Sequence, residues 1–310
     1  MALYSLSAII KFERTKRGWT LKELAKKAGV SESTISRIER DKIKSTEKGT
    51  IDKICNAFKL DVDNFTLRVV SKGILKIEEI KRQIDKALEQ RDGSLVKELL
   101  QELDDNPSYT HRNDPLERQF RLRVDAEMLL NHGKKKKYDA ILKMLTIAMQ
   151  YVREDFDINN IKCDRYNYSE IKIIRLIATV HFEREDLKRA YEILVEVKKS
   201  MELHYVSRYD RADGYIKVLY NLSKLEGLEG NHSEAMDLCD TAITEILETG
   251  NYKMMPAILY NKAYGLECLG KRDESLEIFM HLKSVCILYQ EDKLLEFVIK
   301  SVKKKFGKDI

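Results

Sequence analysis

Residues 19–40 read WTLKELAKKAGVSESTISRIER, and this stretch predicts two short helices joined by a tight turn. Thr20 and Glu23 form a T-x-x-E capping box, so the first helix begins directly after Thr20. Gly29 tolerates a positive φ and ends that helix. Ser31 is the N-cap of a second helix.

Small and branched apolar residues in the same stretch fit two helices that cross steeply. Ala25 is small enough for a close contact at the crossing, while Ile35 and Ile38 share one face of the second helix and pack back. Such a pair is a helix-turn-helix, whose second helix enters the major groove of DNA by its N-terminal part. An ordinary hairpin of two helices is the alternative.

The stretch resembles the Cro/C1-type repressor helix-turn-helix family, the xenobiotic-response-element type, over roughly residues 4–67. The matching positions are Trp19-Thr20, Glu23-Leu24-Ala25, Gly29-Val30-Ser31, Ser33-Thr34-Ile35-Ser36 and Ile38-Glu39. A helix around Thr50–Leu60 and a turn at Asp61–Leu67 complete a five-helix outline. The resemblance implies binding to duplex DNA as a dimer on two half-sites.

Polar residues of the second helix and basic residues around it are the candidate DNA contacts. The side chains placed to reach base edges are Ser33, Thr34, Ser36 and Arg37, and arginine is the usual bidentate partner of guanine. The first-turn groups of Thr20 and Ser31 suit phosphate contacts. Cations that would neutralise phosphates are Lys22, Arg40, Lys42 and Lys44, although each lysine also fits a solvated face.

Two positions depart from this family's pattern. Many relatives carry Gln directly after the capping Thr, where it contacts a phosphate, and this sequence has Leu21 there. Glu32 is acidic at the mouth of the groove. It either accepts a hydrogen bond from a cytosine amino group or complements the positive end of the helix dipole, and the sequence leaves both roles open.

Charge separates this N-terminal head from the rest of the 310 residues. Residues 1–72 carry 16 Lys and Arg against 9 Asp and Glu, whereas the other 238 residues carry 40 against 42. A basic head indicates a polyanionic partner, without distinguishing DNA from RNA or a membrane surface. We expect a DNA-binding domain at 1–67, a linker at 68–74, and a repeat domain for peptide binding and dimerisation at 75–310.

The pattern of the remaining residues predicts a series of repeated amphipathic helices. Leu219-Tyr220-Asn221 recurs forty residues later as Leu259-Tyr260-Asn261. Small residues twelve positions apart mark close helix contacts, in the pairs Ala178 and Ala190, Ser223 and Ala235, and Ala263 and Ser275. The pattern resembles tetratricopeptide repeats lengthened beyond their usual period of about 34 residues. Five helix pairs are expected, beginning near residues 74, 116, 169, 211 and 254.

The expected fold class is therefore all-α: a five-helix head followed by a right-handed tetratricopeptide-like α-solenoid. Asp292–Phe306 is amphipathic and ends in Lys303-Lys304-Lys305, which is typical of a C-terminal capping helix. Only 3 Pro and 13 Gly interrupt the chain, which argues against an all-β or a disordered protein. A helical bundle with accidental similarity to these repeats is the alternative.

A polar stripe follows the first helices of three predicted pairs, which line the concave face of such a solenoid. Its candidate peptide-binding residues are Lys172, Arg175, Lys217, Tyr220, Asn221, Lys224, Tyr260, Asn261 and Tyr264. Asparagine offers both a donor and an acceptor and so suits a peptide backbone, while the cations suit a carboxylate. The stripe also fits the solvated side of a solenoid that binds nothing.

No catalytic or metal-binding motif accompanies these features. Nucleotide-binding, dinucleotide-binding and zinc-protease patterns are missing, and the six histidines do not cluster at ligand spacing. The five cysteines are scattered and form no C-x-x-C motif, which predicts reduced thiols in a cytoplasmic protein. We expect no enzyme activity, no cofactor, no metal and, because no apolar run is long enough, no membrane span.

A Cro-type head on a tetratricopeptide-like body resembles the peptide-pheromone receptors of Gram-positive bacteria, the Rgg, PlcR and PrgX group. The resemblance implies a cytoplasmic homodimer that regulates transcription at a palindromic operator. It also implies a short signalling peptide whose main chain is held by asparagines such as Asn221 and Asn261. Two other functions remain open: a phage or mobile-element repressor whose repeats bind another protein, and a scaffold whose head has lost DNA binding.

Overall fold

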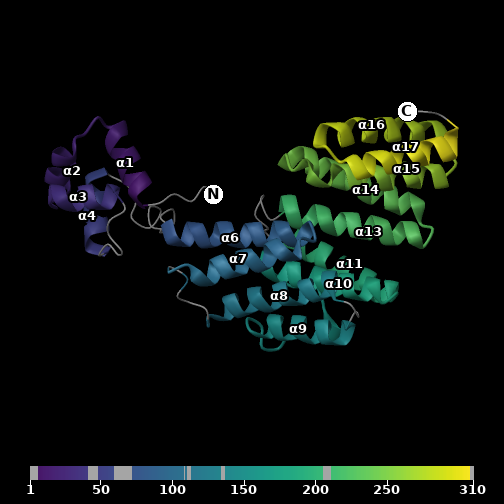
Figure 1. The fold of residues 1–310 in the computed structure, drawn as a ribbon, viewed down its shortest axis with the longest axis horizontal. Coiled ribbons are helices and arrows are strands. Elements are labelled where there is room, and N and C mark those ends of the chain that lie inside the picture. Colours follow the sequence, from purple (N-terminus) through teal and green to yellow (C-terminus); the bar gives the residue numbers. More distant parts are fainter. Residues whose placement is uncertain are drawn as a thin grey trace. The chain divides into compact units, whose positions relative to one another are not determined.

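The computed structural model describes residues 6–40, 48–58, 72–107, 109, 113–133, 137–204 and 211–307. Every regular element within these ranges is a helix (Figure 1), which confirms the predicted all-α fold class. The chain divides into two compact units, Met1–Arg112 and Asn113–Ile310. None of the described helices is long and apolar enough to cross a membrane.

The head of unit 1 contains the helices α1 (Leu6–Lys16), α2 (Leu21–Ala28), α3 (Glu32–Glu39) and α4 (Lys48–Phe58). The predicted pair is α2 and α3, and each begins at the residue after its predicted cap. The helix expected around residues 50–60 is α4. The turn expected at 61–67 lies outside the described residues.

The turn between α2 and α3 is built as its sequence predicts. Thr20 Oγ1 accepts a hydrogen bond from Glu23 N at 3.2 Å, and Glu23 Oε2 accepts one from Thr20 N at 2.7 Å. Gly29 has a φ of 64°, a left-handed conformation that favours glycine because a Cβ atom would be strained there. Ser31 Oγ accepts from Thr34 N at 3.0 Å, which caps α3.

Apolar side chains from all four of these helices form the core of the head. Ile10, Leu24 and Ile35 are fully buried in it. The ring of Trp19 stacks on that of Phe58 with centroids 5.7 Å apart, which packs the residues before α2 against the end of α4. The core therefore holds α2 and α3 in a defined orientation.

Unit 1 also contains the antiparallel pair α6 (Lys72–Glu89) and α7 (Gly93–Asp105), which pack on each other. The last three residues of the predicted linker at 68–74 are thus already helical, and the first four lie outside the described residues. This pair was expected to belong to the repeat domain, whereas its contacts group it with residues 1–112.

Unit 2 is a succession of helix pairs. Its α-helices are α8 (Pro115–His132), α9 (Tyr138–Gln150), α10 (Tyr168–Glu183), α11 (Leu187–Leu203), α13 (Ile216–Leu228), α14 (His232–Thr249), α15 (Met255–Cys268), α16 (Arg272–Tyr289) and α17 (Asp292–Phe306). Single turns of other helix types are η1 (Ile158–Asn160), the π-helical η2 (Arg211–Tyr215) and η3 (Tyr252–Met254). The five predicted pairs begin within two residues of the expected positions, at 72, 115, 168, 211 and 255.

The spaced small residues lie at helix crossings, as predicted. Ala263 on α15 and Ser275 on α16 are both fully buried, and Ser275 Oγ donates a hydrogen bond to Ala263 O at 2.7 Å. This contact requires that the two helix axes approach closely, which a larger side chain at either position would prevent. Ala178 and Ala190 are likewise buried on α10 and α11.

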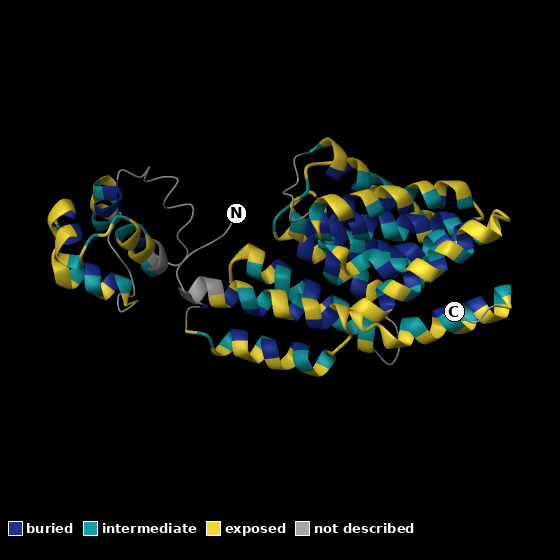
Figure 2. Ribbon diagram, turned by 90° about the horizontal axis from the view of Figure 1, so that it is seen from above, coloured by how far each residue is buried: buried dark blue, intermediate teal, exposed yellow. Residues whose placement is uncertain are grey.

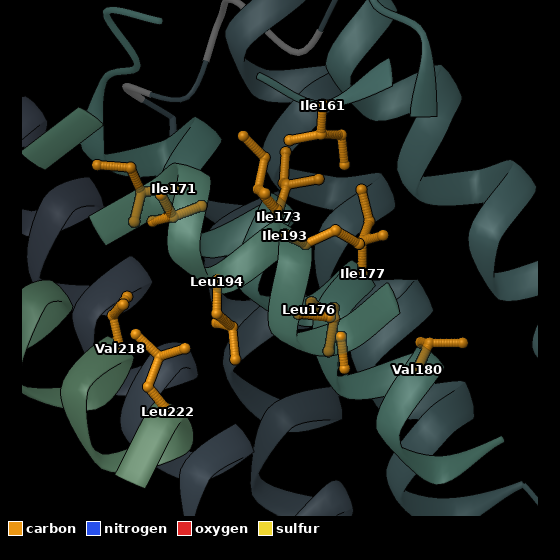
Figure 3. Packing of buried hydrophobic residues seen from close by; sticks show 14 of the residues in the cluster. Ile161, Ile171, Ile173, Leu176, Ile177, Val180, Ile193, Leu194, Val218 and Leu222 are labelled. Atoms are coloured by element: carbon orange, nitrogen blue, oxygen red, sulfur yellow. The ribbon is translucent and has the colours of Figure 1, made fainter. Parts of the chain in front are cut away.

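One continuous apolar core joins the middle pairs of unit 2. Ile177 on α10, Leu194 on α11 and Leu222 on α13 belong to the same buried cluster (Figure 3). Along most helices of unit 2 the buried positions lie on one side and the exposed positions on the other, while nearly all of α10 is buried or half-buried (Figure 2). At the C-terminal end, α17 inserts Val298 and Val302 into the core of the last pair, which confirms the predicted capping helix.

Candidate functional site

The helix α3 has one buried face and one exposed polar face. Ile35 and Ile38 point into the core, as expected. The predicted DNA contacts on α3 and at its ends are all exposed or half-buried: Ser31, Glu32, Ser33, Thr34, Ser36, Arg37 and Arg40. Lys22 on α2 is also exposed. Lys42 and Lys44 lie outside the described residues.

Three hydroxyl groups gather at the N-terminus of α3. Ser31 Oγ lies 2.8 Å from Ser33 Oγ and 2.7 Å from Thr34 Oγ1. The positive end of the helix dipole and the free backbone N–H groups of this first turn favour an anion. The arrangement therefore suits a phosphate oxygen beside the N-terminus of the helix.

The long side chain of Arg37 is available to a partner. It is exposed and forms no ion pair with any residue that the structure describes. The same is true of Glu32, which also remains compatible with both of its predicted roles. An unpaired guanidinium on this face can donate two hydrogen bonds to a guanine edge.

Thr20 is less available than its position predicts. Its hydroxyl donates to Glu23 Oε2 at 2.9 Å and accepts from Glu23 N, so both of its hydrogen-bonding roles are used within the cap. The hydrogen bonds from the Thr20 backbone and side chain also lower the pKa of Glu23. A phosphate at this position would have to compete with the Glu23 carboxylate.

A contact between α1 and α3 was not predicted from the sequence. Arg14 on α1 donates to Glu39 through Nε at 2.6 Å and through Nη2 at 2.8 Å, and its Nη1 donates to Trp19 O at 2.8 Å. The two charged side chains are only 14% and 8% exposed. This bidentate pair holds the C-terminal end of α3 against α1 and so orients the exposed face of α3.

The predicted peptide-binding stripe lies on α10, α13 and α15, the first helices of three successive pairs. All nine of its residues are exposed or half-buried. The helices α13 and α15 are in contact, and Asn261 Nδ2 on α15 donates a hydrogen bond to Ser223 Oγ on α13 at 3.0 Å. Lys224 lies over the ring of Phe182, with Nζ 4.2 Å from the centroid, which joins α13 to the end of α10.

The two asparagines of the stripe differ in their bonding. Asn261 uses its amide to bind Ser223 on the preceding repeat. Asn221 occupies the same repeat position, but the small residue of its preceding repeat is Ala178, which has no hydroxyl. Asn221 forms no hydrogen bond to any described residue, so its donor and acceptor both remain available to a ligand.

The tyrosines at the α15 end of the stripe are engaged by other side chains. Tyr260 packs against Phe297 of α17, with ring centroids 5.5 Å apart. Lys305, also from α17, lies 4.8 Å from the centroid of the Tyr264 ring. A hydrogen bond with Cys268 raises the pKa of Tyr264. The capping helix therefore approaches this end of the stripe, which sequence spacing did not indicate.

The other end of the stripe contains a group of charged side chains. Lys217 Nζ lies 2.6 Å from Asp213 Oδ1, and the Tyr168 hydroxyl donates to the same carboxylate. Burial acts to raise the pKa of Asp213, but the charge and hydrogen bond of Lys217, the Tyr168 hydroxyl and the charge of Arg175 lower it to about 2. Lys172 lies over the Tyr168 ring, 4.4 Å from its centroid.

The described residues contain no group of three or more His, Cys, Asp or Glu side chains that could hold a metal ion. All five cysteines are free thiols. Burial raises the pKa of Cys55 and of Cys239 to about 11, so these two thiols are held in their protonated form.

Comparison with known proteins identifies the head and the fold. Residues 10–65 match the helix-turn-helix family. No curated protein sequence matches the chain. Because the family match covers the exposed α3 and its neighbours, the predicted helix-turn-helix is confirmed.

Three solved structures share the fold over nearly the whole chain. PlcR from Bacillus thuringiensis, in complex with the peptide PapR7 and DNA, is 17% identical with a TM-score of 0.65, over 95% of this chain and 99% of that one. ComR from S. thermophilus, in complex with DNA and its signalling peptide ComS, is 14% identical with a TM-score of 0.56, over 98% and 100%. The Streptococcus dysgalactiae SHP pheromone receptor Rgg2(C45S) is 13% identical with a TM-score of 0.54, over 97% and 100%. The predicted resemblance to this group of receptors is thus confirmed for the fold.

Proposed function

We propose that the protein is a cytoplasmic, sequence-specific DNA-binding regulator of transcription whose helical repeats bind a short signalling peptide. One observation carries the proposal: a helix-turn-helix with an exposed polar α3 is joined to a helical body with the fold of receptors solved with peptide and DNA. No catalytic step is part of this function.

DNA recognition would use the exposed face of α3. The hydroxyls at its N-terminus and the cations Lys22 and Arg40 would hold phosphates, and Arg37 would read a base edge in the major groove. The Arg14–Glu39 pair fixes α3 before DNA arrives, so less conformational entropy is lost on binding. A homodimer would place two heads on half-sites separated by about 34 Å or a multiple of it.

Peptide recognition would use the polar stripe. Asn221 has the donor and the acceptor that a peptide unit requires, and it lies one helical turn from Lys217 on α13. The peptide would change DNA binding by favouring one arrangement of the protein over another. This effect requires that the peptide bind the two arrangements with different affinity.

A single preparation of the purified full-length protein tests both parts. Duplexes selected from a random library should share a motif with two half-sites, and small peptides released from the protein should be identified by mass spectrometry. Adding the released peptide, made synthetically, should change the affinity for the selected duplex.

The outcomes separate the alternatives. Selection of duplexes with no shared motif would reject sequence-specific binding by the head. Recovery of a stable protein partner with no peptide would favour the repressor of a phage or mobile element.

A further inference from the structure

A charged cluster lies where α10 meets the start of α13. It consists of Tyr168, Lys172 and Arg175 on α10, Asp213 on η2 and Lys217 on α13, and we name it the α10–α13 cluster. Three of the five side chains are cations, and one is a carboxylate. These five groups therefore carry an excess of positive charge on the face that bears the polar stripe.

Asp213 is already satisfied within the cluster. It accepts from Lys217 and from the Tyr168 hydroxyl. The Lys217 and Asp213 side chains are only 12% and 24% exposed, which protects this ion pair from water. Each carboxylate oxygen therefore already has a donor, Lys217 at Oδ1 and Tyr168 at Oδ2.

Backbone geometry keeps this arrangement in place. A Cβ atom at Gly214 would lie 3.1 Å from Tyr168 Cε2, so a larger residue there would require the tyrosine ring to shift by a few tenths of an ångström. The π-helical turn sets the direction of Asp213 just before α13 begins. Such turns occur often at functional sites because they redirect side chains within a helix.

Arg175 is the member of the cluster without an acceptor. Its guanidinium donates no hydrogen bond to any described residue, and its Nε atom is buried. A buried donor without an acceptor is costly. The charge of Arg175 helps to lower the pKa of Asp213, but the hydrogen bonds of that carboxylate are with Lys217 and Tyr168. The side chain is half-buried, so the guanidinium remains within reach of a ligand.

We propose that Arg175 binds a carboxylate of the peptide ligand, either its C-terminal carboxylate or an Asp or Glu side chain. The planar guanidinium matches a carboxylate in a bidentate pair, which an ammonium does not. Lys217 and Asn221 are one turn apart on α13, so a carboxylate beside the cluster leaves the adjoining peptide unit near Asn221. This inference rests on the proposed peptide binding and adds the chemistry that the ligand must carry.

The first test uses pools of random short peptides and the full-length protein. One pool lacks Asp and Glu and has free C-termini, a second is the same with C-terminal amides, and a third has amidated C-termini but contains Glu. Bound peptides are identified by mass spectrometry. We expect enrichment from the first or third pool, and its reduction by about tenfold in Arg175→Gln, because the bidentate charge-assisted pair is lost.

The comparison between pools identifies the source of the carboxylate. Enrichment from the first pool assigns it to the C-terminus, and enrichment from the third alone assigns it to a side chain. The matched control is Lys199→Gln on α11, a cation that is 53% exposed and pairs with Glu196, and it should bind like the unmodified protein. Equal enrichment from all three pools, unchanged in Arg175→Gln, would overturn the inference while leaving peptide binding intact.

A second measurement tests whether Arg175 binds a carboxylate, and it requires no peptide. The Nε–H signal of Arg175 in a ¹⁵N-arginine NMR spectrum is followed while N-acetyl-leucine is added, with N-acetyl-leucinamide as the uncharged control. We expect the acid alone to shift this signal. If neither compound moves it, the carboxylate site is absent, whether or not the pools contain a ligand and whether or not Arg175→Gln folds.

Discussion

Asn221 and Asn261 hold the same position in two successive repeats, yet their neighbours differ. Asn261 reaches the hydroxyl of Ser223, whereas the residue that corresponds to Ser223 one repeat earlier is Ala178. A side chain that bonds within the protein stabilises the fold, and one that has no internal partner is free to bind a ligand. One difference between Ser and Ala thus separates a structural asparagine from a candidate ligand contact.

The two asparagines should respond differently to replacement by alanine. Asn221→Ala should weaken peptide binding with little effect on the free energy of unfolding. Asn261→Ala should lower that free energy by about 1 kcal/mol, because the Ser223 hydroxyl loses its donor. Peptide titration of both variants measures the change in peptide affinity, and urea denaturation measures the change in the free energy of unfolding. Equal effects of both variants on peptide affinity would show that the internal bond does not decide their roles.

Replacement of Arg37 and of Lys22 by alanine should have different effects on DNA binding. Arg37→Ala should cost about 1–3 kcal/mol on the selected duplex and relax the preference at one base pair. Lys22→Ala should weaken binding to all sequences alike and reduce the slope of log affinity against log salt by about one. Affinities at several salt concentrations, on the selected and a scrambled duplex, distinguish the two. An Arg37→Ala protein with unchanged preference would exclude the base contact.

At the scale of helices, the position of α3 depends on a side chain from α1. The Arg14–Glu39 pair is shielded from water and links residues 25 positions apart. The hydrogen bond to Glu39 raises the pKa of Arg14, so the guanidinium remains charged. Loss of one partner would leave a shielded charge without its counter-ion, which is more costly than loss of both.

Glu39→Gln should therefore destabilise the head by about 1–3 kcal/mol and weaken DNA binding, although Glu39 is not expected to contact DNA. Trp19 is the only tryptophan of the chain and lies in the head, so its fluorescence in urea reports this loss directly. The double variant Arg14→Met with Glu39→Leu is the control and should recover part of the stability. If Glu39→Gln unfolds like the unmodified protein, α3 is positioned by the apolar core alone.

The contact of η2 with α10 and α13 should make unit 2 sensitive to acid. The pKa of Asp213 is about 2 in the folded protein, below its ordinary value of 3.8, so its ionised form stabilises the fold above about pH 4. This contribution is lost as the pH falls from about 4 to about 2. Asp213→Asn should cost about 2 kcal/mol at neutral pH, and the difference from the unmodified protein should shrink over that range.

Urea denaturation followed by circular dichroism, repeated between pH 7 and pH 2, measures this difference. Asp273→Asn on the exposed first turn of α16 is the matched control. A difference between Asp213→Asn and the unmodified protein that stays constant with pH would mean that the carboxylate charge is not what stabilises the contact.

At the scale of the whole chain, the two compact units have separate apolar clusters. The head cluster contains Trp19 at its edge, whereas the long cluster of unit 2 runs through the helix pairs from α8 to α15. Because the two clusters are separate, one can be disrupted while the other stays packed, and a chain of several units commonly departs from two-state behaviour.

Unfolding measured by Trp19 fluorescence should therefore not coincide with unfolding measured by circular dichroism at 222 nm. The fluorescence follows only the head, and the dichroism follows all of the helices. DNA binding should move the fluorescence transition to higher urea, because a ligand stabilises the part that binds it. Superimposable transitions in the absence of DNA would mean that the chain unfolds as one unit.

The sequence alone determined what short-range chemistry decides. Capping boxes, the glycine at the turn and the helical spacing of apolar residues act within three or four positions. The bounds of α2 and α17, the start of α3 and the starts of the helix pairs therefore followed from local patterns. The exposed side of α3, with Arg37 on it, followed from the buried side by the same spacing.

Only the tertiary structure decided which side chains meet across helices. The bonds of Arg14 with Glu39, Asn261 with Ser223, and Tyr168 with Asp213 join residues 25, 38 and 45 positions apart. No periodicity along the chain specifies such pairs, because they depend on the crossing and rotation of neighbouring helices. For that reason the sequence predicted which residues form the stripe but not their contacts. The packing of Tyr260 against Phe297, the absence of a described hydrogen bond at Asn221 and the unpaired guanidinium of Arg175 depend on the tertiary structure.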